Sequence, residues 1–174
     1  MRLMHHGDVD LRYRPLTADD VLDLDDTFTT DVVFSVSSGP LAFSLTPVPV
    51  SPRTKTFPPD DDPLPQEGFA AEDSGLRGFI SVEIADWHSR LVIRQLTVAP
   101  EYRGRGVGRR LMELGVQWGR ERGARTAWLE TSSVNVPAVR AYQRMGFALC
   151  GLDTTLYRGT PSEGEVALYM GREL

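Results

Sequence analysis

The chain has 174 residues, of which 41% are hydrophobic, and its formal net charge at pH 7 is −5. The length suits one hydrophobic core, so we expect a single domain over residues 1–174, and the negative charge argues against a general affinity for nucleic acid or anionic lipid. The single cysteine excludes an intrachain disulfide, and the lack of a signal-peptide core or a membrane-length apolar run predicts a cytoplasmic protein.

The first half of the chain gives weak signals of regular structure. Residues 9–14 predict a short strand that ends at Pro15, and Thr17 followed by Asp20 is typical of a helix start. Short apolar runs at 32–36 and 41–45 flank a turn and predict a hairpin. Eight of the twelve prolines lie between residues 40 and 65. We therefore expect a long surface loop at 46–76, which is either a substrate lid or a mobile insertion.

Regular patterns return from residue 79 onward. Alternating apolar residues predict a strand at 79–85, which pairs with a strand at 91–98 in an antiparallel hairpin. An apolar stripe predicts a helix that begins near Val107 and ends near Gly123. Together the elements predict an α/β (α+β) fold with one mixed, mainly antiparallel central sheet flanked by helices. The remaining predicted elements are a strand at 126–131, a short helix between Pro137 and Gly146, and strands at 147–150 and 165–170.

Charge is distributed unevenly along the chain. Residues 100–125 contain seven arginines and three glutamates, an excess of +4, so the other 148 residues carry −9. A locally basic region in an otherwise acidic protein suits a polyphosphate ligand together with a cationic second substrate. The outer arginines are equally well explained as a solvated helix face. Six aspartates between residues 19 and 31, with no basic residue among them, are either solvated or attract a cationic substrate.

Three glycines, Gly104, Gly106 and Gly108, alternate with arginine and valine between the strand at 91–98 and the next helix. Without side chains, several backbone N–H groups can converge on one anion, and the positive end of the helix adds to the attraction. The loop lacks the Gly-Lys-Ser/Thr of a Walker loop and the glycine spacing of a dinucleotide motif. We therefore predict a pyrophosphate site of another kind. The alternative is a glycine-rich turn with solvated arginines.

The pattern that remains is Arg-x-x-Gly-x-Gly, formed by Arg103, Gly106 and Gly108. It resembles the acetyl-CoA signature of the GCN5-related N-acetyltransferase (GNAT) superfamily. A second stretch, from Leu129-Glu130-Thr131 through Asn135 and Tyr142 to Gly146-Phe147, resembles the later GNAT motif. The two motifs cover about residues 91–148. The C-terminal half is most similar to streptothricin-type acetyltransferases, through segments such as Gly151-Leu152-Asp153 and Glu165-Val166-Ala167-Leu168-Tyr169, whereas the first 75 residues show no such match.

The resemblance implies that the protein binds acetyl-CoA as co-substrate. Backbone groups along 96–98 would pair with the pantetheine arm like an added strand, and the glycine loop would hold the diphosphate. The Asn and Tyr of the second motif would flank the arm from the other side. The predicted cofactor-binding residues are Leu96, Thr97, Val98, Arg103, Gly104, Arg105, Gly106, Val107, Gly108, Arg109, Asn135 and Tyr142.

Acetylation of an amine needs a base that takes a proton from the amine and an acid that protonates the departing thiolate. Tyr142 is the predicted acid, because a phenol is protonated at pH 7; the alternative is a core tyrosine. The resemblance implies Glu130 as the base, acting through water, and a structural hydrogen-bond acceptor is an equally good explanation of it. Glu83, on the polar face of the preceding strand, competes for the role of base. Many GNAT enzymes carry an acidic residue near positions 94 and 95, where this chain has Arg94 and Gln95.

We expect acetyl transfer to a primary amine by direct attack in a ternary complex, because Cys150 is predicted to lie in a buried strand and gives no reason to expect an acetyl-cysteine. The acceptor is a small cationic molecule, such as a streptothricin- or aminoglycoside-like antibiotic or a polyamine, or a protein or peptide N-terminus. The alternative function is a non-catalytic acyl-CoA-binding regulatory module. We expect no metal, since the three histidines are scattered, and no nucleic-acid or membrane partner; a homodimer is left open.

Overall fold

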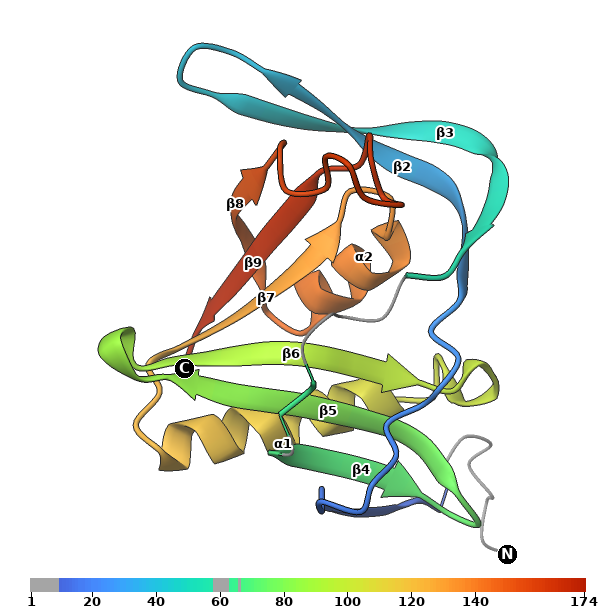
Figure 1. Cartoon of the computed structure of the whole chain (residues 1–174), viewed down its shortest axis with the longest axis vertical. Helices are drawn as coiled ribbons and strands as arrows, with labels where there is room; N and C mark the ends of the chain where they lie inside the picture. Colours follow the sequence, from blue (N-terminus) through green and yellow to red (C-terminus); the bar gives the residue numbers. More distant parts are fainter. Residues whose placement is uncertain (1–9, 58–62, 66) are drawn as a thin grey trace, which may run out of the picture.

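A seven-stranded mixed sheet forms the centre of the structure (Figure 1). The computed structural model describes residues 10–57, 63–65 and 67–174. The strands lie in the order β1-β4-β5-β6-β7-β9-β8, and all neighbours are antiparallel except β6 and β7. The predicted mixed, mainly antiparallel sheet is thereby confirmed. The bounds are β1 Arg12–Pro15, β4 Gly68–Glu72, β5 Leu76–Ala85, β6 Arg90–Val98, β7 Thr126–Ser132, β8 Ala148–Asp153 and β9 Ala167–Glu173.

The parallel pair β6 and β7 lies together at one end and separates at the other (Figure 1). Pairing joins only Arg90–Ile93 of β6 to Thr126–Leu129 of β7. Just beyond, β6 carries a β-bulge at Arg94, because two residues of β5, Ser81 and Val82, face three residues of β6. A bulge bends its strand and re-aims the side chains that follow. The last part of β6 is therefore free to diverge from β7.

Helix α1 (Val107–Glu121) covers β4, β5 and β6. Two glycines on its buried face, Gly115 and Gly119, let the helix approach the sheet closely. A Cβ atom at these positions would stand 2.9 Å from side-chain atoms of Ile80 and Leu91, respectively. The predicted helix is confirmed. The apolar residues that it buries are Val107, Leu111, Met112 and Val116.

Helix α2 (Val136–Arg144) contacts β7 and β2 (Phe28–Ser38). Its first turn is capped by Asn135, whose Oδ1 accepts a hydrogen bond from the N–H of Ala138 at 3.3 Å, as expected for an N-cap residue. Gly146, with φ of 88°, follows the helix and adopts the left-handed conformation that glycine favours. In the part of the chain that the structure describes, no helix is long and apolar enough to cross a membrane.

Strand β8 is the outermost strand on its side of the sheet, and this position corrects the prediction that Cys150 is buried. Cys150 is exposed and lies in a β-bulge, because Leu149 and Gly151 pair with consecutive residues of β9. A bulged residue on an edge strand leaves the regular alternation of inward and outward side chains. An apolar sequence run could not reveal this bulge.

The N-terminal segment after β1 departs from the predicted helix. Residues 16–27 are all described and contain only a single turn, in which Asp20 Oδ2 accepts a hydrogen bond from the backbone N–H of Thr17 at 2.7 Å. Leu22 and Leu24, two residues apart, pack against the cluster of Leu16, Ala70 and Phe79. A spacing of two suits an extended chain. Six closely spaced aspartates with no basic residue among them also disfavour a helix through like-charge repulsion.

The predicted surface loop at 46–76 is wrong at 46–55 and 68–72, where the chain forms strands, while its residues 58–62 and 66 lie outside the described residues. Residues Phe43–Lys55 form β3, which pairs with β2 (Phe28–Ser38) in a long two-stranded ribbon, and residues 68–72 form β4. Pro47 and Pro49 are tolerated because β3 has only one partner, and prolines two residues apart share one edge of a strand. The shorter predicted hairpin around residues 37–40 is confirmed. The ribbon passes the ends of β7, β8 and β9 (Figure 1).

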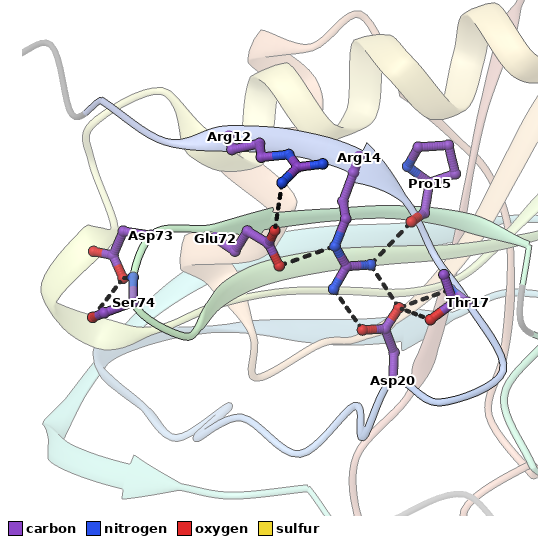
Figure 2. A network of polar contacts seen from close by, with 8 residues as sticks. All are labelled: Arg12, Arg14, Pro15, Thr17, Asp20, Glu72, Asp73 and Ser74. Carbon is purple, nitrogen blue, oxygen red and sulfur yellow. Dashed lines mark hydrogen bonds and ion pairs between the residues drawn. The ribbon is translucent and has the colours of Figure 1, made fainter.

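A network of charged side chains anchors the start of the N-terminal segment (Figure 2). The Arg14 guanidinium donates two hydrogen bonds to Asp20, at 2.7 and 2.8 Å, and one to Glu72 at 2.9 Å. The side chains of Arg14 and Asp20 are only 24% and 12% exposed. The hydrogen bonds from Arg14 hold the pKa of Asp20 well below its usual range. Arg14 therefore ties β1 and β4 to the chain that follows.

Replacing Arg14 by alanine is expected to lower the free energy of unfolding by about 1–3 kcal/mol, the range for hydrogen bonds to charged groups. Because the pKa of Asp20 is depressed in the folded state, the contribution is complete above about pH 4 and is lost as pH falls toward the folded pKa. Urea unfolding near pH 7 and near pH 3 tests both points. Arg12→Ala is the control: Arg12 is 77% exposed with one pairing to Glu72 at 4.0 Å, so a change below about 0.5 kcal/mol is expected.

Candidate active site

A cavity of about 1080 Å³ opens where β6 and β7 diverge. Both strands contribute walls, at 92–98 and 128–132. The other walls come from the glycine loop, α2, the chain that leads into β2, Phe57 after β3, and three residues between 157 and 162. Ligand pockets span roughly 300–1000 Å³, so this cavity is as large as the largest of them.

The glycine loop forms one end of the cavity. Gly104, Gly106 and Gly108 all line it, and the first two adopt left-handed φ angles of 73° and 84°. Apart from each glycine and its chain neighbours, no heavy atom of the described residues lies within 4 Å of the place where a Cβ would stand at Gly104 or Gly106. Gly106 is also the N-cap of α1, so the unpaired N–H groups of the first turn emerge at this loop. Bare backbone and a helix N-terminus fit a pyrophosphate.

The arginines around the loop take different positions. Arg103 lines the cavity, but its guanidinium donates to three backbone carbonyls: Val98 at 2.8 Å, Thr27 at 2.5 Å and Asp25 at 2.7 Å. Arg109 also lines the cavity. Arg105 is not among the residues that line the cavity. Its guanidinium lies over the ring of Tyr102, 5.8 Å from the ring centroid. The side chain of Val107 is buried in the core as well, so only its backbone can face a ligand.

The last residues of β6 form the wall next to the loop. Leu96, Thr97 and Val98, which were predicted to bind the cofactor, line the cavity. The Thr97 hydroxyl accepts a hydrogen bond from Gln95 at 3.0 Å. Because β6 pairs with β5 on one side and has left β7 on the other, the side facing the cavity can accept an extended ligand as an added strand.

Asn135, the N-cap of α2, and Tyr142, on α2, also line the cavity. The ring of Tyr142 packs edge-on against Phe147, with centroids 6.2 Å apart. Burial raises the pKa of Tyr142 to about 12. Among the described residues its hydroxyl has no hydrogen-bond partner, so this proton can reach a ligand in the cavity.

Glu130 lies in the cavity, at the point where β7 has left β6. The hydroxyl of Tyr157 donates a hydrogen bond to Glu130 Oε1 at 2.9 Å. Burial, and then the charge of Glu130, raise the pKa of Tyr157 well above its usual value. Glu83 is not among the cavity-lining residues and pairs instead with Arg94 at 3.3 Å. Of the two candidate bases, only Glu130 is brought together with Tyr142.

Several cavity residues were missed by the sequence reasoning. Asp26 belongs to the acidic run, which was the one signal that pointed to it. Phe28 and Phe57 stack with ring centroids 5.6 Å apart, although 29 residues separate them in the chain. No local sequence pattern predicts a contact between residues so far apart in the chain. The further lining residues that were not predicted are Val92, Ile93, Arg94, Gln95, Trp128, Leu129, Thr131, Ser132, Pro137, Ala138, Ala141, Arg144, Met145, Tyr157, Thr160 and Ser162.

Comparison with protein-family models assigns residues 42–147 to the acetyltransferase (GNAT) family. The matched range includes β5, β6, the glycine loop, α1, β7 and α2, and therefore most of the cavity. It also includes all of β3, in the part of the chain where the sequence had shown no resemblance.

The similarity to individual proteins extends over almost the whole chain. The streptothricin acetyltransferase of Streptomyces lavendulae is 45% identical in an alignment of 170 positions that covers 90% of each chain. The crystal structure of nourseothricin acetyltransferase matches with a TM-score of 0.87 and 48% identity over 95% of this chain and 99% of the other. A putative streptothricin acetyltransferase from Bacillus anthracis, solved with acetyl coenzyme A, matches with a TM-score of 0.79 and 26% identity over 94% and 99%. The chain therefore belongs to the acetyltransferase (GNAT) family and is an N-acetyltransferase.

Proposed function

We propose that the protein transfers an acetyl group from acetyl-CoA to a primary amine of a small cationic acceptor of the streptothricin type. The observation that carries this proposal is the joint presence, in one cavity, of a glycine loop suited to pyrophosphate and of the pair Glu130 and Tyr142. The names of two similar proteins, the streptothricin acetyltransferase of Streptomyces lavendulae and nourseothricin acetyltransferase, support streptothricin as the acceptor.

Binding of acetyl-CoA would use the backbone more than side chains. The N–H groups at Gly104–Gly108 would hold the diphosphate, helped by the positive end of α1 and by Arg109. The free side of residues 96–98 would align the pantetheine arm, and Asn135 and Tyr142 would flank it from the other side. Arg103 would not contact acetyl-CoA directly, because its guanidinium already donates hydrogen bonds to three backbone carbonyls. It would instead support the site by holding those backbone segments in place. Acetyl-CoA supplies the acetyl group as a reactive thioester.

The chemical step needs one proton removed and one delivered. Glu130 would accept the proton of the acceptor ammonium, directly or through a water molecule, and Tyr157 would hold the carboxylate in position through its hydrogen bond. Tyr142 would give its proton to the departing sulfur. The only cysteine, Cys150, does not line the cavity, which supports direct attack by the amine in a ternary complex.

Glu130→Gln is expected to lower kcat by about 100-fold, the lower range for a general base, because an amide of the same shape cannot accept the proton. The rate should be measured by release of free thiol with streptothricin as acceptor. Glu173→Gln is the matched control, since Glu173 is exposed at the far end of β9. If the Glu130 variant turned over as fast as the control, another group would be the base.

A screen with acetyl-CoA tests the function itself. Thiol release should be followed with streptothricin, aminoglycosides, polyamines and short peptides as acceptors. We expect turnover to be fastest with streptothricin. Binding of acetyl-CoA without turnover of any amine would favour the alternative, a non-catalytic acyl-CoA-binding module.

A further inference from the structure

One wall of the cavity includes Asp26 and Phe28, which belong to residues 25–28, the chain that leads into β2. Arg103 fixes this segment, because its guanidinium binds the carbonyls of Asp25 and Thr27 together with that of Val98 at the end of β6. Asp25 Oδ1 also accepts a hydrogen bond from the N–H of Thr27 at 2.9 Å. One side chain thus joins the end of β6 to a segment far away in the sequence.

Within this segment only Asp26 and Phe28 line the cavity. Phe28 is fixed by its stacking on Phe57. The fold thereby places the aspartates of the acidic run between residues 19 and 31 in different environments. Asp20 is bound by Arg14, and the Asp25 side chain closes the local turn. Of the six aspartates in the run, Asp26 alone belongs to the cavity.

Asp26 is a partly buried carboxylate with no ion pair among the described residues. Burial raises its pKa, a hydrogen bond from its own backbone N–H lowers it, the charge of Asp25 raises it and the charge of Arg103 lowers it, with a net increase. A carboxylate that is partly removed from water without a cationic partner is costly. A ligand that carries a positive charge would supply that partner.

We propose that Asp26 is a specificity-determining residue, which binds a second positively charged group on the acceptor while the reacting amine lies near Glu130. Asp26 and Glu130 are the two acidic residues among those that line the cavity, and they come from different walls. The inference rests on the proposed function, since it assumes an amine acceptor in this cavity. It predicts an acceptor with at least two positive charges.

The test is calorimetric titration of streptothricin into the protein saturated with CoA, together with steady-state kinetics. Asp26→Asn should weaken streptothricin binding and raise its KM by about 10- to 100-fold, the effect of losing a hydrogen bond to a charged group. The affinity for acetyl-CoA should change less than about twofold. Asp26→Glu, which keeps the charge, should restore part of the loss. Added salt should weaken streptothricin binding more in the wild type than in Asp26→Asn.

Asp23→Asn is the matched control, because it removes the same charge from the same acidic run at an exposed position outside the cavity. Equal streptothricin affinity in Asp26→Asn and the control would overturn the inference while leaving the proposed function intact. Loss of acetyl-CoA affinity in Asp26→Asn would also overturn the inference, because Asp26 would then belong to the acetyl-CoA site. If the wild type neither bound nor acetylated streptothricin, the proposed function would fail with it.

Discussion

Tyr142→Phe is expected to lower kcat by about 100-fold or more while leaving the affinity for acetyl-CoA within about twofold. The substitution removes the proton that would reach the departing sulfur. It keeps the aromatic ring that packs on Phe147. The hydroxyl has no partner among the described residues, so its loss leaves no buried group unpaired and should not destabilise the fold. Burial holds the pKa of Tyr142 at about 12, so the acid stays protonated throughout the neutral range.

Thiol release and calorimetric binding of acetyl-CoA measure the two effects separately. Tyr13→Phe is the matched control, because Tyr13 is a half-buried tyrosine on β1 outside the cavity. A kcat for Tyr142→Phe equal to that of the control would assign the proton to another donor, and Tyr157 would be the next to test.

Gly106→Val is expected to weaken acetyl-CoA binding by about 100-fold or more, the effect of losing roughly two hydrogen bonds to a charged ligand. Gly106 has φ of 84° and lies where the loop meets the first turn of α1. A β-branched residue is strained at this angle, and its side chain would stand in the space where the N–H groups converge.

Gly123→Val separates lost binding from lost stability. Gly123 follows the end of α1 with φ of 81°, and, as at Gly106, no heavy atom of the described residues beyond its chain neighbours lies within 4 Å of its Cβ position. Both variants should therefore lose about 1–3 kcal/mol of stability from backbone strain. Only Gly106→Val should lose acetyl-CoA binding. Equal binding by the two variants would remove the glycine loop from the cofactor site.

The fold from β5 onward could be predicted from the sequence because its signals are local. Alternating apolar residues marked β5, the glycine loop marked the start of α1, and Asn135 with Pro137 marked the start of α2. Before β5, little beyond β1 and the hairpin turn around residues 37–40 could be predicted in this way. Prolines that usually indicate a loop lie in β3, a strand with one partner, and the helix-start pattern at Thr17 and Asp20 forms only one turn.

Some residues of the candidate site could likewise be predicted from local sequence signals, and others could not. Residues near the glycine loop and on α2 could be predicted because spacing alone carries the resemblance. Arg105 and Val107 follow the same spacing, yet the fold directs one side chain to Tyr102 and the other to the core. Asp26 and Phe28 reach the cavity only through contacts with Arg103 and Phe57, which are distant in the sequence. Such contacts depend on the whole fold.

The most direct test of the account is the mass of the acceptor after the purified protein has been incubated with acetyl-CoA and streptothricin. We predict that each acceptor molecule gains one acetyl group, that one free CoA thiol appears for each group transferred, and that Gly106→Val and Tyr142→Phe both slow the reaction. An unchanged acceptor mass, in a sample that binds acetyl-CoA, would contradict the claim that this cavity brings the thioester and the amine together.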